Sequence, residues 1–264
     1  MRRLLITGAA GTLGRMARAR LGGLADVLRL SDISDPGAAG PGEEVRIGDL
    51  ADAAFVNDLV AGCDGIVHFG GISVEDDFSK ILGANIVGVK NLYEAARLNG
   101  RPRILFASSN HVVGFHPQTA KLDATAEMRP DGWYGVSKGY GELVAKMYWE
   151  KAGVETAILR IGSCLPEPGD RRQLSTWLSH DDFVQFAERV FGAPRLGCPV
   201  VYGASANAAS WWDNRAADHL GWAPKDDAEA YRAKVEAAAP RPAADAPEAV
   251  YQGGVFTADP IYPD

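Results

Sequence analysis

The sequence predicts an α/β fold, with a doubly wound parallel sheet and a small carboxyl-terminal lobe. The first reason is an alternation of short apolar runs with segments of helical length, which is typical of βαβ units that feed a parallel sheet. The second is a glycine-rich turn that directly follows the first apolar run. A length of 264 residues suits one such domain.

The elements are expected in a regular order along the chain. Five apolar runs are predicted to be strands: Arg3–Thr7, Val27–Leu30, Gly65–Phe69, Arg103–Ser108 and Thr156–Ile161. A further strand is expected to end at Asp49-Leu50. Patterns compatible with helices are Gly11–Leu21, Ala53–Ala61, Ile81–Leu98, Tyr134–Lys151 and His180–Phe191. Asp182 is expected to cap the last of these helices.

The chain changes character from Pro166 onward. Pro/Gly turns and the Trp211-Trp212 pair predict a smaller lobe over the carboxyl edge of the sheet. Residues 237–248 (AAAPRPAADAPE) predict a flexible arm. The last sixteen residues carry Tyr251, Phe256 and Tyr262, which are expected either to pack back or to reach a neighbouring subunit.

The composition argues against several classes of protein. The net charge is −7 and the acidic residues are interspersed, which disfavours binding to nucleic acid or to an anionic membrane. Cys63, Cys164 and Cys198 are far apart and form no CxxC, so neither a disulfide framework nor a metal site is expected. No stretch approaches the roughly 20 apolar residues of a membrane span. A cytoplasmic protein is the expectation.

The glycine-rich turn is a candidate dinucleotide site. Gly8-Ala9-Ala10-Gly11-Thr12-Leu13-Gly14 has the spacing GxxGxxG and leads from a strand into a helix. Glycine lets the backbone approach a pyrophosphate, whose charge then lies at the helix N-terminus. A tight turn without a ligand is the alternative. Asp32, 18 positions beyond Gly14, would accept hydrogen bonds from ribose hydroxyls and repel a 2′-phosphate, so NAD is favoured over NADP.

Other strand ends point to the same cofactor, as expected of a Rossmann-type sheet. Asp49, followed by Leu50, would meet the adenine amino group, although a surface turn explains this residue nearly as well. Phe69-Gly70-Gly71 ends the fourth strand, where glycines would let the cofactor cross the sheet edge. Asn85 would satisfy a water or a backbone group beside the nicotinamide, and an ordinary polar helix residue is an equal alternative.

Tyr134 and Lys138 are the candidate catalytic pair. The segment Tyr134-Gly135-Val136-Ser137-Lys138 places a phenol and an ammonium group at i and i+4 on one helix face. Tyrosine has an unperturbed pKa of about 10, so it acts as a base near neutral pH only if a positive charge stabilises the phenolate. Lys138 and an oxidised nicotinamide would supply that charge. Ser109, 25 positions ahead of Tyr134, would hold the reacting oxygen.

The TGxxGxxG loop, Asp32, Ser109 and YxxxK, in this order, resemble the extended short-chain dehydrogenase/reductase superfamily over essentially the whole chain. Several blocks are similar to its uronate dehydrogenases: Phe106-Ala107-Ser108-Ser109-Asn110-His111, Ile161-Gly162-Ser163-Cys164, Leu174–Asp182, Gly203–Asn207 and Trp211–Asn214. The resemblance implies a single domain over residues 1–264. In it, residues 1–165 are mainly the NAD-binding core and residues 166–264 mainly a substrate-capping lobe and an arm.

The resemblance also implies a reaction. Uronate dehydrogenases use NAD to oxidise the anomeric carbon, C1, of a hexuronate such as glucuronate or galacturonate to an aldarolactone. Tyr134 would take the proton of the C1 hydroxyl as hydride leaves for the nicotinamide, with Ser109 hydrogen-bonded to the same oxygen. The residues implied at the cofactor are Gly8, Gly11, Thr12, Leu13, Gly14, Asp32, Ile33, Asp49, Leu50, Phe69, Gly70, Gly71, Asn85, Tyr134, Lys138 and Cys164.

Further residues are implied at the substrate. Arg172 resembles the family's arginine for the carboxylate, because a planar guanidinium suits bidentate recognition, and Arg171 beside it could be confused with it. The residues implied to bond sugar hydroxyls or the carboxylate are Ser73, Asn110, His111 and Ser163. Their structural alternatives are, in that order, a helix cap, a turn residue, a packed polar residue and a strand-end turn.

Two other functions share part of this pattern. A nucleotide-sugar epimerase or dehydratase has the same cofactor loop and YxxxK, but only about 100 residues follow the sixth strand to hold a nucleotide. A dinucleotide-sensing regulator would not need Ser109, Tyr134 and Lys138 together. A homo-oligomer is expected because similar dehydrogenases associate. Glucuronate, galacturonate and mannuronate differ only in hydroxyl direction, so the choice among them depends on pocket geometry.

Overall fold

The strand β1 (Arg3–Thr7) is the centre from which the sheet is built. Its buried side chains alternate between two faces, since Leu4 and Ile6 join one apolar cluster and Leu5 joins the other. In the computed structural model, which describes residues 1–262, β1 pairs in parallel with both β2 and β4. A strand buried on both faces between parallel neighbours is characteristic of a doubly wound α/β fold.

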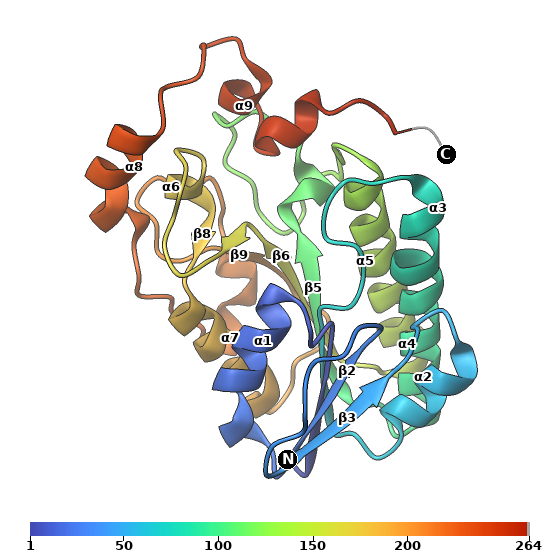
Figure 1. The fold of residues 1–264 in the computed structure, drawn as a ribbon. Helices are drawn as coiled ribbons and strands as arrows, with labels where there is room; N and C mark the ends of the chain where they lie inside the picture. Colours follow the sequence, from blue (N-terminus) through green and yellow to red (C-terminus); the bar gives the residue numbers. More distant parts are fainter. Residues whose placement is uncertain (263–264) are drawn as a thin grey trace.

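Seven parallel strands form the main sheet in the order β3-β2-β1-β4-β5-β6-β9, which confirms the predicted Rossmann-type fold (Figure 1). With β1, its strands are β2 (Val27–Asp32), β3 (Glu43–Ile47), β4 (Gly65–His68), β5 (Arg103–Ser109), β6 (Thr156–Ile161) and β9 (Val200–Gly203). A second, small sheet pairs β7 (Ser163–Cys164) with β8 (Trp177–Leu178). The third strand ends at Ile47, so the prediction that it ends at Asp49-Leu50 is two to three residues too long.

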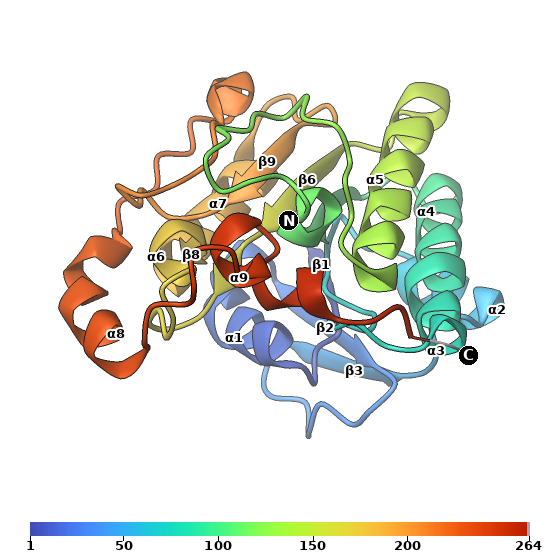
Figure 2. The ribbon, with the colours of Figure 1, turned by 90° about the horizontal axis from the view of Figure 1, so that it is seen from above.

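Helices cover both faces of the sheet (Figures 1 and 2). They are α1 (Thr12–Arg20), α2 (Ala53–Val60), α3 (Phe78–Ile81), α4 (Gly88–Leu98), α5 (Trp133–Ala152), α6 (Gln173–Thr176), α7 (His180–Gly192), α8 (Arg232–Ala238) and α9 (Pro247–Val250). The apolar cluster on one face includes side chains of α1 and α7, and the cluster on the other face includes side chains of α2, α4 and α5. Within residues 1–262, no helix is both long and apolar enough to cross a membrane.

The helix predicted over Ile81–Leu98 is interrupted. Between α3 and α4 the chain forms a π-helical turn, Leu82–Val87. Such turns are rare and concentrate at functional sites. This one contains Asn85, whose side chain bonds the backbone of Ile72 and the hydroxyl of Ser137. The π turn therefore ties the segment that follows β4 to helix α5.

The carboxyl-terminal part contributes to the sheet as well as to a lobe. From residues 166–264, α7 and β9 join the main layers, whereas α6, α8 and α9 lie beyond the carboxyl edge of the sheet (Figure 1). The predicted arm, 237–248, runs from the end of α8 to the start of α9. Tyr251 then forms a β-bridge with Pro117 and its ring lies 5.5 Å from that of Phe115. The tail thus packs back on its own chain, and the last two of its sixteen residues lie outside the described residues.

Asp182 does not cap α7, contrary to the prediction. Ser179 is the N-cap, and its hydroxyl accepts a hydrogen bond from the Asp182 N–H at 3.0 Å. The carboxylate of Asp182 instead accepts bonds from the N–H groups of Lys225 and Asp226, at 2.8 and 3.1 Å. Asp182 therefore joins α7 to the carboxyl-terminal lobe, a role that depends on residues more than 40 positions away.

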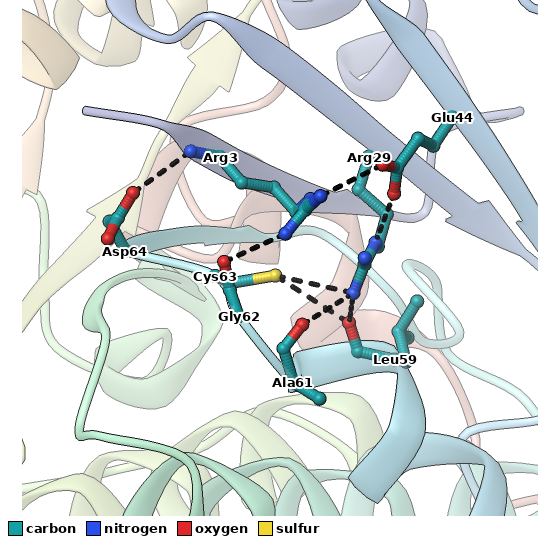
Figure 3. Close-up of polar contacts among 8 residues, drawn as sticks. All are labelled: Arg3, Arg29, Glu44, Leu59, Ala61, Gly62, Cys63 and Asp64. Carbon is teal, nitrogen blue, oxygen red and sulfur yellow. Dashed lines mark hydrogen bonds and ion pairs between the residues drawn. The ribbon is translucent and has the colours of Figure 1, made fainter.

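A polar network joins β2, β3 and the end of α2 (Figure 3). The buried Arg29 forms an ion pair with Glu44, with 2.8 Å between Nε and the nearer carboxylate oxygen. Its Nη1 donates to the carbonyl oxygens of Leu59 and Ala61, at 2.6 and 2.9 Å. The last carbonyl groups of a helix lack intrahelical partners, so Arg29 satisfies the end of α2.

Candidate active site

A cavity of about 990 Å³ lies at the carboxyl edge of the main sheet. It is lined by the turns that follow β1, β2, β4 and β5 and by the first turns of α5. The strand order reverses between β1 and β4, because the sheet grows to β2 and β3 on one side and to β5 and β6 on the other. Ligands of doubly wound sheets bind at such a switch point. The cavity therefore lies where a dinucleotide is expected.

Gly8 and Gly14 bring the glycine loop and helix α1 into direct contact. Gly8 has a φ of +70°, and a Cβ there would lie 2.8 Å from the backbone nitrogen of Gly70. A Cβ on Gly14 would lie 2.0 Å from the carbonyl oxygen of Gly8. Gly11 is the N-cap of α1 and no side chain caps this helix, so its first N–H groups remain available to an anion. The loop therefore fits a pyrophosphate.

Asp32 holds this loop from the end of β2. Its Oδ2 accepts a hydrogen bond from the Ala10 N–H at 2.9 Å, and its Oδ1 accepts one from the Ser34 N–H at 3.0 Å. A carboxylate has about four acceptor positions, so two accepted bonds leave capacity for hydroxyl donors. The cavity lining includes Asp32, Ile33, Asp49 and Leu50.

The turn after β4 packs closely against the π turn. A Cβ on Gly71 would lie 2.6 Å from Oδ1 of Asn85. Asn85 is buried outside the cavity lining, and its amide is bonded to Ile72 and Ser137, at 2.8 to 3.0 Å. Asn85 thus satisfies a backbone group, which is one of the two roles expected for it. Its contact with the cofactor stays a prediction.

Tyr134 and Lys138 lie in the cavity on the first two turns of α5. The Lys138 Nζ lies 5.6 Å from the centre of the Tyr134 ring. Burial raises the pKa of Tyr134 to about 12, a hydrogen bond with Ser109 offsets part of that rise, and the charge of Asp131 adds to it. The protein's own groups therefore keep the phenol protonated at neutral pH, and a positively charged ligand would be needed to make it a base.

Lys138 is anchored as well as buried. Its Nζ donates a hydrogen bond to the carbonyl oxygen of Ala107 at 2.9 Å and lies 5.5 Å from the centre of the Phe106 ring. Burial lowers the pKa of Lys138 to about 8. With Ser109 in the same cavity lining, the three residues predicted to be catalytic meet at one place.

Arg172 and Arg171 have different surroundings. Arg171 forms an ion pair at 3.0 Å with Glu236 of α8. Arg172 donates from Nε to the carbonyl oxygen of Gln252 at 2.6 Å, while its buried Nη2 has no hydrogen-bond partner among residues 1–262. Burial lowers the pKa of Arg172, an effect that the charges of Asp170 and Asp131 oppose. A buried guanidinium nitrogen without a partner indicates a ligand with an acceptor oxygen.

The residues implied at the substrate fall into two groups. Ser73, Ser109, His111 and Tyr134 line the cavity, whereas Asn110, Ser163 and Arg172 are outside its lining. Asn110 is wholly buried, and within the described chain neither its Oδ1 nor its Nδ2 has a partner. The hydroxyl oxygens of Ser163 and Thr176 lie 3.3 Å apart. Asn110 and Arg172 thus both have buried polar atoms without a partner in the described residues.

Three features of this site were not predicted from the sequence. Glu75 accepts hydrogen bonds from the first N–H groups of α5, including that of Tyr134. Asp131 bonds the Nδ1 of His111 at 2.7 Å. Phe256, from the carboxyl-terminal tail, lies with its ring 4.0 Å from that of His111. Only the third had a signal in the sequence, namely the aromatic residues of the tail.

Residues 4–185 match the NAD dependent epimerase/dehydratase family. Relatives with established names cover nearly the whole chain. A uronate dehydrogenase of Agrobacterium fabrum is 58% identical over 262 residues, which is 99% of either protein. A uronate dehydrogenase of Pseudomonas putida is 58% identical over 255 residues, which is 96% of this chain and 95% of the relative.

Solved structures show the same likeness. The uronate dehydrogenase from Agrobacterium tumefaciens, in a tyrosine-to-alanine mutant complexed with NAD, has a TM-score of 0.99 and 57% identity over 100% of both chains. The glucuronic acid dehydrogenase from Chromohalobacter salexigens has a TM-score of 0.97 and 53% identity, over 98% of this chain and 97% of that chain. The similarity therefore includes the carboxyl-terminal lobe as well as the sheet.

Proposed function

This chain belongs to the NAD dependent epimerase/dehydratase family and, within it, to the uronate dehydrogenases, and from that premise we propose that it oxidises C1 of a hexuronate to the aldarolactone. It is an NAD-dependent oxidoreductase. The observation that carries the choice of substrate is Arg172, a buried guanidinium whose Nη2 has no partner in the described residues. A carboxylate on the substrate would satisfy it.

The residues around the cavity fit NAD. The glycine loop and the uncapped start of α1 would take the pyrophosphate, and the free acceptor positions of Asp32 would take the ribose hydroxyls. A carboxylate at that position would repel the 2′-phosphate of NADP. When bound, NAD supplies the hydride acceptor and a positive charge close to the reacting carbon.

Tyr134 is the proposed base. It would accept the proton of the C1 hydroxyl, while Ser109 holds the same oxygen by a hydrogen bond. The phenol has a pKa of about 12 in the surroundings that the protein provides, so the reaction depends on added positive charge. Lys138, whose Nζ lies 5.6 Å from the Tyr134 ring centre, already belongs to those surroundings, so the oxidised nicotinamide would supply the additional charge. Because the ring oxygen stays attached to C1, oxidation there yields a lactone.

Arg172 and Asn110 are the proposed partners of the substrate carboxylate. The Nε of Arg172 is already engaged by the Gln252 carbonyl, so the guanidinium would offer its remaining N–H groups. A Cβ on Gly253 would lie 2.0 Å from Oδ2 of Asp131, and one on the adjacent Gly254 would lie 2.7 Å from Cδ of Arg172, which supports a location of Arg172 close to Asp131. The buried, unpartnered amide of Asn110 would add a neutral donor.

The test is an assay that compares acid and neutral sugars. The protein is incubated with NAD and, separately, with glucuronate, galacturonate, mannuronate, glucose and galactose, and the absorbance of reduced nicotinamide is followed. We expect turnover of at least one uronate, and the nuclear magnetic resonance spectrum of the early product should be that of the lactone. Equal rates with glucose and glucuronate would contradict the proposed carboxylate site. The open-chain diacid as the first product would contradict oxidation of C1 in the closed ring form of the sugar.

Location and assembly belong to the same proposal. We propose a cytoplasmic homo-oligomer. All three cysteines are free, which agrees with a reducing compartment, and the exposed apolar side chains Val136, Leu143 and Met147 on α5 support contact with another copy. Light scattering of the purified protein would give its mass. Among residues 1–262 no group of three or more His, Cys, Asp or Glu side chains is arranged to hold a metal ion.

A further inference from the structure

His111 and Asp131 form a buried pair beside the base. The Nδ1 of His111 and the Oδ2 of Asp131 are 2.7 Å apart, and the Asp131 side chain is 1% exposed. His111 lines the cavity together with Tyr134, and the centres of their two rings are 5.8 Å apart. The pair therefore lies next to the place where the substrate's C1 is expected.

The surroundings of the Asp131 carboxylate leave no room for larger neighbours. A Cβ on Gly114 would lie 1.9 Å from Oδ2 of Asp131, and a Cβ on Gly253 would lie 2.0 Å from the same atom. Gly114 follows the 3₁₀ turn that contains His111, and Gly253 belongs to the carboxyl-terminal tail. Two separate segments thus approach this carboxylate through glycine, and a side chain on either glycine would displace it.

The position of Asp131 is unfavourable in two respects. Its Oδ1 is buried and has no hydrogen-bond partner among the residues that the structure describes, and a buried polar atom without a partner destabilises a fold. Its charge also raises the pKa of Tyr134, which opposes the removal of a proton by that residue. Base catalysis therefore does not explain the carboxylate. The charge of Asp131 favours the ionised form of Arg172, and the side-chain hydrogen bond that Asp131 makes within the described residues is to His111.

The His111 ring is held on one face and at Nδ1. Phe256 packs on one face with 4.0 Å between ring centres, and the backbone N–H of His111 bonds the Oγ of Ser109 at 3.2 Å. Nδ1 is engaged by Asp131. Nε2 makes no hydrogen bond within residues 1–262 and is not sealed off from solvent, and His111 is one of the residues that line the cavity.

We propose that Asp131 is a positioning residue that accepts the Nδ1–H of His111 and so presents Nε2, as a hydrogen-bond acceptor, to a hydroxyl of the bound sugar. In a neutral imidazole one nitrogen is a donor and the other an acceptor, and the bond at the first decides the role of the second. An acceptor cannot bond a carboxylate, which has no proton to give, so His111 reads a hydroxyl and leaves the carboxylate to Arg172.

This inference rests on the proposed function and adds a specificity device to it. Epimeric uronates differ in the direction of one hydroxyl, and an acceptor held in a fixed position distinguishes an O–H that points at it from one that points away. Loss of the bond would leave the ring packed by Phe256 but free to take the other tautomer. Epimer preference would then fall more than the rate of the chemical step.

The first experiment compares Asp131→Ala and Asp131→Asn with the wild type on glucuronate and mannuronate, which differ in the direction of the C2 hydroxyl, next to C1. For Asp131→Ala we expect the KM of the better epimer to rise roughly ten-fold, as for the loss of one oriented hydrogen bond, with kcat within about three-fold and the Kd of NAD unchanged. The ratio of kcat/KM between the two epimers should approach one. Asp131→Asn keeps an acceptor oxygen and should recover part of the loss.

Asp182→Ala is the matched control, because Asp182 is also a buried carboxylate, 3% exposed, but bonds backbone N–H groups of the lobe. Asp182→Ala should lower Tm and leave the ratio of kcat/KM between the two epimers unchanged. Equal changes of that ratio in Asp182→Ala and Asp131→Ala would reduce Asp131 to a structural residue and overturn the proposal. If Asp131→Ala does not fold, the epimer ratio of Asp131→Asn is compared with that of Asp182→Ala instead.

The second experiment reads the tautomer directly and needs no substrate. Nitrogen-15 magnetic resonance of the wild-type protein with NAD, with His111→Gln to assign the signal, should show His111 neutral, with Nδ1 protonated and Nε2 not. A proton on Nε2 at neutral pH would overturn the proposal. If no uronate is oxidised at all, the proposed function fails instead, and the tautomer still decides whether Asp131 directs His111.

Discussion

The carboxylate of Glu75 accepts a hydrogen bond from the backbone N–H of Tyr134 at 2.8 Å, and its other oxygen accepts one from Trp133 at 2.7 Å. These N–H groups belong to the first turn of α5, which has no other cap from a side chain. A Cβ on Gly132 would lie 2.3 Å from the same carboxylate. The segment that carries Ser73 is thereby fastened to the helix that carries the base.

Replacing Glu75 should therefore affect both stability and rate. We expect Glu75→Ala to lower the free energy of unfolding by about 1–2 kcal/mol, as for other N-terminal caps, and to lower kcat because the start of α5 is no longer fixed. Asp52→Ala is the control, since Asp52 caps α2 through the N–H groups of Ala54 and Phe55. Urea unfolding and initial rates should show a similar loss of stability in both variants and a loss of kcat in Glu75→Ala alone. Equal kcat values in Glu75→Ala and Asp52→Ala would show that the cap by Glu75 does not affect catalysis.

Tyr134→Phe should abolish most turnover and preserve NAD binding, because only the proton acceptor is lost. General acid–base groups contribute about 10²–10⁴-fold in rate. Steady-state assays give the rate, and a fluorescence titration gives the Kd of NAD. If the variant kept more than about a tenth of the wild-type rate, a loss far below that range, Tyr134 would not be the base.

Lys138 predicts a pH dependence of stability. Burial lowers its pKa from 10.5 to about 8, so between these values the unfolded chain binds the proton more strongly than the folded protein does. Stability contributed through Lys138 therefore rises with pH across this window and is lost as the pH falls below it. In urea unfolding without added NAD, the wild type should gain stability relative to Lys138→Met between about pH 8 and 10. Parallel pH curves for the two proteins would show that the ammonium is not desolvated.

Arg172→Ala should lower kcat/KM for the uronate by about two to three orders of magnitude. Breaking a buried ion pair costs roughly 3–5 kcal/mol, and about 1.4 kcal/mol corresponds to a factor of ten. Arg172→Lys should recover only part, because an ammonium keeps the charge and loses the planar fork. Arg171→Ala should be mild in kinetics, since Arg171 pairs with Glu236 of α8. A large defect at Arg171 with a small one at Arg172 would reverse the assignment.

Asp32→Ala should raise the KM for NAD and narrow the gap to NADP, because the variant loses the acceptors for the ribose and the repulsion of a 2′-phosphate. It also removes the bonds to the Ala10 and Ser34 N–H groups, so some loss of Tm is expected. Initial rates with both cofactors give the ratio of kcat/KM. An unchanged ratio of kcat/KM between NAD and NADP would show that Asp32 does not contact the ribose.

Much of the fold and of the cofactor site follows from local patterns in the sequence. Alternating apolar runs predict β1, β2, β4, β5 and β6 within two residues, because strand and helix periods are repeated over a few neighbouring positions. The turn over Gly8–Gly14 and the i, i+4 spacing of Tyr134 and Lys138 are local as well, so their shared place in the cavity could be anticipated. No such pattern predicted the short strand β9.

Only the tertiary structure decided which distant groups meet. Glu75 is 59 positions from Tyr134, and the carbonyl that holds Arg172 is 80 positions from it. Asp131 is paired with His111 across 20 positions of chain, and Asp182 turned from an expected cap into a link to the lobe. A side chain's partner across such distances depends on how loops and the tail fold over the sheet edge, and no periodic pattern in the sequence encodes that. The sequence determined the elements and the chemistry of the candidate groups, whereas packing chose their partners.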